Sequence, residues 1–175
     1  MMHQRTTGFT LLEMVVTIAT LSILAMLVTP YLSLSVRAYN DNAVESKILG
    51  ELRYASERIA RELRELRRNP TPPPSDFDIA TPFASNRIIF FRNDGERVTI
   101  DGTAPLLNIS YQSLQADTLF PLSTSLQSLG FTYLQSDEAP ALSGSDLAYI
   151  TFEIQLVANG QTYRQRSRVA LRAQP

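Results

Sequence analysis

The sequence predicts an α+β fold, in which one long N-terminal helix packs against an antiparallel β-sheet head. Three observations lead to this prediction. An uncharged apolar stretch near the N-terminus is followed by a stretch with apolar residues at helical spacing, and the second half of the chain is rich in β-forming residues and turns. The chain has 175 residues, of which 44% are hydrophobic, so we expect one folded domain with an appendage.

The composition argues against most enzyme classes. There is no cysteine, and His3 is the only histidine, which removes thiolate or histidine metal sites and serine–histidine triads. The seven glycines form no nucleotide-binding loop. We therefore predict that the chain is not an enzyme, and we predict no catalytic residues, no cofactor and no metal. The net charge of -1 gives no general attraction to nucleic acid or to an anionic membrane surface.

The first element expected is a transmembrane helix over residues 9–36. Between Glu13 and Arg37 lie 23 residues without a charge, and a bilayer core needs about 20 apolar helical residues. Arg5 precedes this stretch, which predicts a cytoplasmic N-terminus with the remainder outside. An ordinary cleaved secretory signal or a simple signal anchor is the alternative, but the apolar stretch is long and carries an acid at its start.

That acid, Glu13, needs a partner, because a carboxylate in the apolar segment costs about 2–3 kcal/mol. A cut between Gly8 and Phe9 would create a new amino terminus, and Glu13 would lie one helical turn, about 5.4 Å, further along. Between two parallel chains shifted by about one turn, the carboxylate of one meets the amine of the other. Such a pair would fix the axial register of neighbouring helices.

The motif Gly8-Phe9-Thr10-Leu11-Leu12-Glu13 with the apolar stretch behind it resembles the class III signal of type IV pilins and type II secretion pseudopilins. The resemblance implies that prepilin peptidase cleaves between Gly8 and Phe9 and that the amine of Phe9 becomes methylated. It also implies that Glu13 is the assembly and register glutamate. Pro30 stands where many pilin helices carry a proline, and it is expected to kink the helix there.

The same resemblance implies the pilin lollipop fold and a place in the cell. The chain would be a single-pass prepilin of the bacterial inner membrane with a periplasmic head, and later part of a pilus or pseudopilus. The implied partners are prepilin peptidase, other pilins and minor pilins through the N-terminal helix, the inner membrane and the pilus assembly platform.

A second helical stretch over residues 37–69 is expected to continue the first as an amphipathic helix. Its apolar residues recur in steps of three and four and predict a face toward a core; they are Val44, Ile48, Leu52, Ala55, Ile59, Leu63 and Leu66. Its charged residues form opposite-charge pairs four residues apart, namely Glu57–Arg61, Arg58–Glu62 and Arg61–Glu65. We interpret them as a solvated face, with a contact face to a neighbouring subunit as the alternative.

Residues 56–64 resemble one group within the pilin family more than others. The stretch Ser56-Glu57-Arg58-Ile59-Ala60-Arg61-Glu62-Leu63-Arg64 resembles a segment of MshO-like minor pilins, the O component of mannose-sensitive haemagglutinin (MSHA) pili. J-type pseudopilins of type II secretion and W-type minor pilins carry looser versions. The predicted organisation is therefore a leader over residues 1–8, the transmembrane stem 9–36, the amphipathic helix 37–69, a proline-rich linker 70–84 and a β-rich head 85–175.

Within the head, the sequence predicts strands joined by recognisable turns. The strands expected are 87–92, 96–100, 106–112, 129–134, 148–157 and 161–172. Asn159-Gly160 predicts a two-residue hairpin turn. It pairs Ile150 with Val169, Phe152 with Ser167 and Leu156 with Tyr163 on one face, and Thr151 with Arg168, Glu153 with Arg166 and Gln155 with Arg164 on the other. One antiparallel sheet is expected to pack on the amphipathic helix.

Two charged groups in the head invite functional hypotheses. The basic stripe of the last strand, Arg164, Arg166, Arg168 and Arg172, could grip phosphates, but it is partly neutralised and lacks interleaved aromatic residues. We interpret it as a solvated or subunit-contact face and do not expect nucleic acid to be a partner. The acids Asp137, Glu138 and Asp146 could bind calcium, but their spacing fits no EF-hand loop, so surface acids are the preferred interpretation.

The favoured functional hypothesis is a minor pilin or pseudopilin that joins a helical filament, in a tip or initiation complex. A J-type pseudopilin of type II secretion is one alternative, and a tip-located adhesion or DNA-binding module is another. A membrane-anchored periplasmic protein that never assembles is a third. The strong motifs are common to MSHA pili, type IV pili and type II secretion pseudopili, so the filament system stays open.

Overall fold

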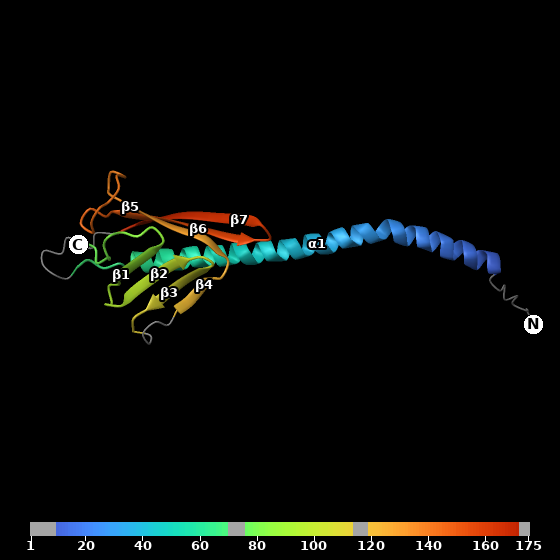
Figure 1. The fold of residues 1–175 in the computed structure, drawn as a ribbon, viewed down its shortest axis with the longest axis horizontal. Coiled ribbons are helices and arrows are strands. Elements are labelled where there is room, and N and C mark those ends of the chain that lie inside the picture. Colours follow the sequence, from blue (N-terminus) through green and yellow to red (C-terminus); the bar gives the residue numbers. More distant parts are fainter. Residues whose placement is uncertain (1–9, 70–75, 114–118, 172–175) are drawn as a thin grey trace, which may run out of the picture. The chain divides into compact units, whose positions relative to one another are not determined.

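A computed structural model describes residues 10–69, 76–113 and 119–171 of the chain. One helix, α1, extends over Leu11–Arg64, and seven strands follow. The chain divides into two compact units, residues 1–43 and 44–175, so the first part of α1 belongs to one unit and its last part to the other. The predicted α+β fold, with a long apolar N-terminal helix and antiparallel sheets, is confirmed (Figure 1).

The head contains two antiparallel sheets. The first has the order β1 (Arg87–Phe91), β2 (Arg97–Thr103), β3 (Leu106–Tyr111) and β4 (Leu119–Ser123), and the second has the order β5 (Leu126–Leu134), β6 (Tyr149–Ala158) and β7 (Gln161–Ala170). The sequence predicts an antiparallel sheet in the head, and the structure divides its strands between two such sheets. The chain changes sheets between Ser123 and Leu126, where the backbone N–H of Ser125 bonds to the hydroxyl of Ser123 and closes a tight turn.

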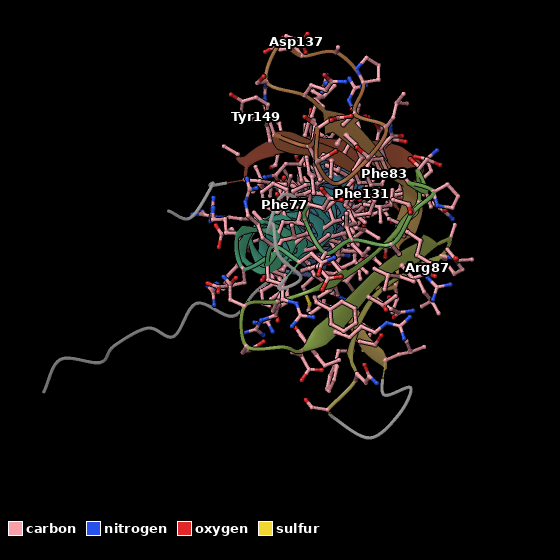
Figure 2. The ribbon with its side chains drawn as sticks, turned by 90° about the vertical axis from the view of Figure 1, so that its left-hand side faces the viewer. Phe77, Phe83, Arg87, Phe131, Asp137 and Tyr149 are labelled. Atoms are coloured by element: carbon pink, nitrogen blue, oxygen red, sulfur yellow. The ribbon has the colours of Figure 1, made fainter. Side chains whose placement is uncertain are left out.

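The last part of α1 and both sheets enclose one apolar core. The two sheets lie on two sides of the helix (Figures 1 and 2). The stripe predicted from helical spacing is buried from Ile48 to Leu66, while Val44 is only partly covered. Alternate residues of the central strands point into the same core, which includes Ile100, Ile109, Phe152 and Ile154.

The predicted terminal hairpin is confirmed residue by residue. Ile150 pairs with Val169, and Glu153 pairs with Arg166. Asn159 and Gly160 have φ values of 49° and 73°, as a type I′ turn requires. The strands predicted for residues 87–92, 96–100, 106–112 and 129–134 correspond to β1, β2, β3 and β5.

Strand β4 has no counterpart in the prediction. Pro121 lies in its middle, and proline argues against a central strand because it lacks an N–H donor. The structure places β4 at the edge of its sheet, where a proline is tolerated, and the ladder to β3 is irregular between Leu107 and Asn108.

The helix ends at Arg64, earlier than the expected residue 69. Beyond it the chain becomes extended, because the N–H of Arg67 donates to the carbonyl of Phe91 at 2.9 Å and Leu66 pairs with Arg92. Pairing with the end of β1 thus replaces the last helical turn.

The described part of the linker, residues 76–84, is more than a spacer. Phe77 is buried, and Ile79 pairs with Phe90 of β1. Further along, Phe83 stacks on Tyr133 with ring centroids 4.2 Å apart, close to Phe131 (Figure 2). The second half of the linker therefore belongs to the head.

Candidate functional site

The N-terminal end of α1 is held by Thr10. Its side-chain oxygen accepts a hydrogen bond from the N–H of Glu13 at 3.3 Å, and its carbonyl accepts one from Met14 at 3.2 Å. Thr10-Leu11-Leu12-Glu13 has the spacing of a capping box, in which a carboxylate lies in the first turn beside the positive end of the helix dipole. The same four residues could have revealed this cap from the sequence.

Glu13 is the only charged residue between Thr10 and Arg37, in a part of the helix whose apolar side chains are exposed. Every residue from Thr10 to Ala43 is exposed, and no charged residue lies between Glu13 and Arg37. By length and composition this helix can cross a membrane, with a mean hydropathy of 2.3 over its most apolar window. An anchoring role for the first part of α1 is compatible with these properties. The predicted cleavage residues Gly8 and Phe9 lie outside the described residues.

Serine and threonine hydroxyl groups along this segment bond back to the helix. The side chains of Thr17, Thr20, Ser22, Thr29, Ser33 and Ser35 each donate to a carbonyl three or four residues earlier, at 2.7–3.1 Å. The helix continues through Pro30, and Figure 1 shows the first part of α1 as a curved ribbon. Two of these bonds, from Thr29 and Ser33, flank the proline, whose missing N–H leaves one backbone carbonyl without its helical donor.

A buried carboxylate, Glu62, forms a polar site inside the head. Glu62 is 3% exposed and lies 3.0 Å from the guanidinium of Arg58 and 3.5 Å from that of Arg92. The hydroxyl of Tyr111 donates to its Oε1 at 2.7 Å. The sequence-based interpretation of this charged run as a solvated face is therefore wrong for Glu62. Of the three expected helical pairs, the described helix forms only Arg58–Glu62.

Tyr111 connects the members of this cluster. Burial, together with the hydrogen bond to Glu62, raises the pKa of Tyr111 to about 12, so its hydroxyl stays a donor. Arg58 donates to the same hydroxyl and lies over the ring at 5.8 Å. Because one carboxylate is shared by two guanidiniums and a phenol, we interpret the cluster as a buried ionic clamp between α1, β3 and the end of β1.

The acids suggested as a calcium site do not converge. Asp137, at the tip of the loop after β5 (Figure 2), accepts from the N–H of Ala139, while Glu138 binds Arg168 at 2.8 Å. Asp146 accepts from neighbouring serines. Within residues 10–69, 76–113 and 119–171, no group of three potential ligands could hold a metal ion.

The basic stripe of β7 lies on the exposed face of that strand. Arg168 stacks on Tyr149 at 3.9 Å, whereas Arg164 and Arg166 extend from the same face; Arg172 is outside the described residues. Arg166 and Glu153 are opposite each other in the register without forming an ion pair, and the carboxylate of Glu153 accepts from Gln155 at 2.7 Å.

Comparison with known proteins adds no relative. No protein-family model matches the sequence, and no curated protein matches it either.

Proposed function

We propose that the chain is a minor subunit of a type IV pilus or a related filament, assembled through its N-terminal helix. The observation that carries this proposal is one acidic residue, Glu13, on the first turn of a long, apolar and exposed helix. Capping and the helix dipole stabilise Glu13 by at most about 1 kcal/mol. This does not offset the cost of about 2–3 kcal/mol for a carboxylate in the apolar segment, so a helix that only anchors a protein has no net gain from it.

The proposed mechanism is electrostatic. After cleavage behind Gly8 by prepilin peptidase, the methylated amine of Phe9 carries a positive charge near the helix tip. In a bundle of parallel helices, the Glu13 carboxylate of one subunit binds that amine on a neighbour shifted by about one turn. Each charge alone is costly in an apolar surrounding, so the pair favours one axial register over others.

The partners follow from this mechanism. Before processing, the chain would be a single-pass protein of the inner membrane with its head in the periplasm, and the assembly platform and other pilins would then receive it. We propose an MSHA-type pilus, in a tip or initiation complex, on the resemblance of residues 56–64. A J-type pseudopilin of type II secretion is the alternative, because the N-terminal features are common to both.

The decisive experiment for processing is a mass spectrum of the N-terminal peptide of the native protein. We expect the mature chain to begin with N-methylated Phe9. A native protein that keeps residues 1–8 would overturn the proposal and leave a membrane-anchored protein that does not assemble.

The register mechanism is tested by Glu13→Gln and Glu13→Ala. Both variants should be made in normal amounts and reach the membrane, yet fail to enter sheared filaments on an immunoblot. Glu45→Gln is the matched control, because Glu45 is an exposed acid on the same helix, beyond the uncharged stretch. Normal incorporation of the Glu13 variants would contradict the mechanism.

A further inference from the structure

One edge of the three-stranded sheet is open. Strand β7 is the last strand of the order β5-β6-β7, so among the residues that the structure describes it pairs with β6 alone. In a two-residue hairpin the closing pair, Ala158 and Gln161, exchanges both hydrogen bonds, and the pattern then alternates along the strands. The N–H and carbonyl groups of the even-numbered residues of β7 therefore point away from β6.

The direction in which a backbone N–H group of β6 points agrees with this alternation. Val157 pairs with Thr162, and its N–H donates to Ser125 at 2.9 Å, away from β7. No backbone hydrogen bond of the described residues uses the outward groups of β7 between Thr162 and Ala170. This edge thus offers a continuous row of backbone donors and acceptors.

A groove follows the open edge. Its volume is about 470 Å³. Its walls include Glu57, Ala60, Arg61 and Arg64 of α1 and Gln165, Ser167 and Arg168 of β7. On the inner side the groove is closed, because the hydroxyl of Ser56 binds both Ser167 at 2.9 Å and Gln165 at 3.1 Å. The space is therefore open to solvent beside the strand rather than beneath the sheet.

The charges along this edge are mostly positive. Four guanidiniums, those of Arg61, Arg64, Arg164 and Arg166, form no hydrogen bond, ion pair or ring contact within the described part of the chain. Of the nearby acids, Glu57 is paired with Arg53, while Glu153 accepts from the neutral amide of Gln155 and keeps its negative charge, so the four guanidiniums still outnumber it. An incoming strand would meet arginines of β7 on one face and arginines of α1 on the other.

We propose that the open edge of β7 binds an extended, acidic segment of another protein by strand addition. Backbone hydrogen bonds would hold the segment, and its carboxylates would face the unpaired guanidiniums. A second copy of β7 is a poor occupant, because antiparallel pairing would bring two arginine rows together, and like charges on opposed strands repel. This proposal does not depend on filament assembly, since the edge lies entirely within the head.

The probe is a peptide of alternating Glu and Val, ten residues long like β7, added to the full chain in detergent micelles at low salt. The control peptide has Lys in place of Glu. Fluorescence anisotropy should show the acidic peptide binding at least about tenfold more tightly, with an affinity that falls as salt rises. Equal binding of the two peptides, or no binding of the acidic one at millimolar concentration, would overturn the proposal.

Two variant pairs separate charge from backbone pairing. Arg164→Glu should weaken binding about tenfold, while Arg97→Glu, at an exposed position on β2, should leave it unchanged. Arg166→Pro removes one outward N–H without removing a bond to β6, so it should bind more weakly than Arg166→Ala, which removes only the charge. If the proline and alanine variants bind alike, the peptide is held by charge alone and strand addition is wrong.

Amide hydrogen exchange gives a direct readout of the edge. Without peptide, the amides of residues 163, 165, 167 and 169 should already be protected by β6. On binding, protection should rise at residues 162, 164, 166 and 168. A uniform change along β7, or a change confined to other strands, would contradict strand addition.

Discussion

Glu62 lies on the buried face of α1, between Ile59 and Leu63 of the apolar stripe. Its position four residues after Arg58 predicts an ordinary surface pair. The partners that make it a buried site, Arg92 and Tyr111, come from segments about thirty and fifty residues further along. No local pattern contains that information, so this part of the site could not be predicted.

Replacing Glu62 by Gln should destabilise the head by about 1–3 kcal/mol, because two guanidiniums and a phenol lose the carboxylate that neutralises and accepts from them. Glu65→Gln is the matched control, since Glu65 follows directly after the last residue of α1, is exposed, and should change stability by less than about 0.5 kcal/mol. Thermal unfolding of the full chain in detergent, followed by circular dichroism, measures both. Equal melting temperatures for the two variants would show that the clamp contributes nothing.

Among the elements, the β6–β7 hairpin was predictable down to its register, while β4 and the end of α1 were not. The register of the hairpin is determined locally, by the turn residues Asn159-Gly160 and by the alternation of the flanking residues. Strand β4 depends on being at an edge, and the last turn of α1 is lost because Arg67 bonds to Phe91. Both outcomes are decided by neighbours that are distant in sequence.

The hairpin turn predicts the effect of a single methyl group. Gly160 has φ +73°, a conformation that costs an L-residue about 1–2 kcal/mol, so Gly160→Ala should lower the free energy of unfolding by about 1 kcal/mol. Gly130→Ala is the control, because it lies in β5 without a positive φ and a Cβ there meets nothing within 4 Å. Chemical denaturation of both variants distinguishes them, and equal midpoints would argue against strain at the turn.

At the scale of the whole molecule, the head depends on the packing of two sheets rather than one. The sequence predicts the strands and the helix that they cover, but the division into two sheets depends on where the chain turns between β4 and β5. The sheets meet where Gly102 of β2 faces Leu129 of β5, and a Cβ at Gly102 would lie 2.3 Å from the Cβ of Leu129. The sheets can therefore approach this closely only because the backbone of Gly102 lies directly against the side chain of Leu129.

Gly102→Ala should destabilise the head by about 1–3 kcal/mol, because the added methyl group forces the sheets apart. Gly50→Ala should have the opposite effect. Gly50 is in α1 with open space around it, so alanine should stabilise the helix by about 1 kcal/mol. Melting temperatures that move in opposite directions would support both statements. A neutral Gly102→Ala would mean that the sheets tolerate a wider separation.

The serine and threonine hydroxyl groups along the first part of α1 need no hydrogen-bond partner from outside the helix. The hydroxyls of Thr17, Thr20, Ser22, Thr29, Ser33 and Ser35 each already have an acceptor inside their own helix. If the acyl chains around the helix were replaced by side chains of other subunits, or the reverse, none of these hydrogen bonds would break and none of these hydroxyl groups would lose its acceptor. Contacts that this surface makes through these residues would rest on dispersion and shape, whereas the Glu13 carboxylate would change its partner when the proposed subunit moves from the bilayer into a filament.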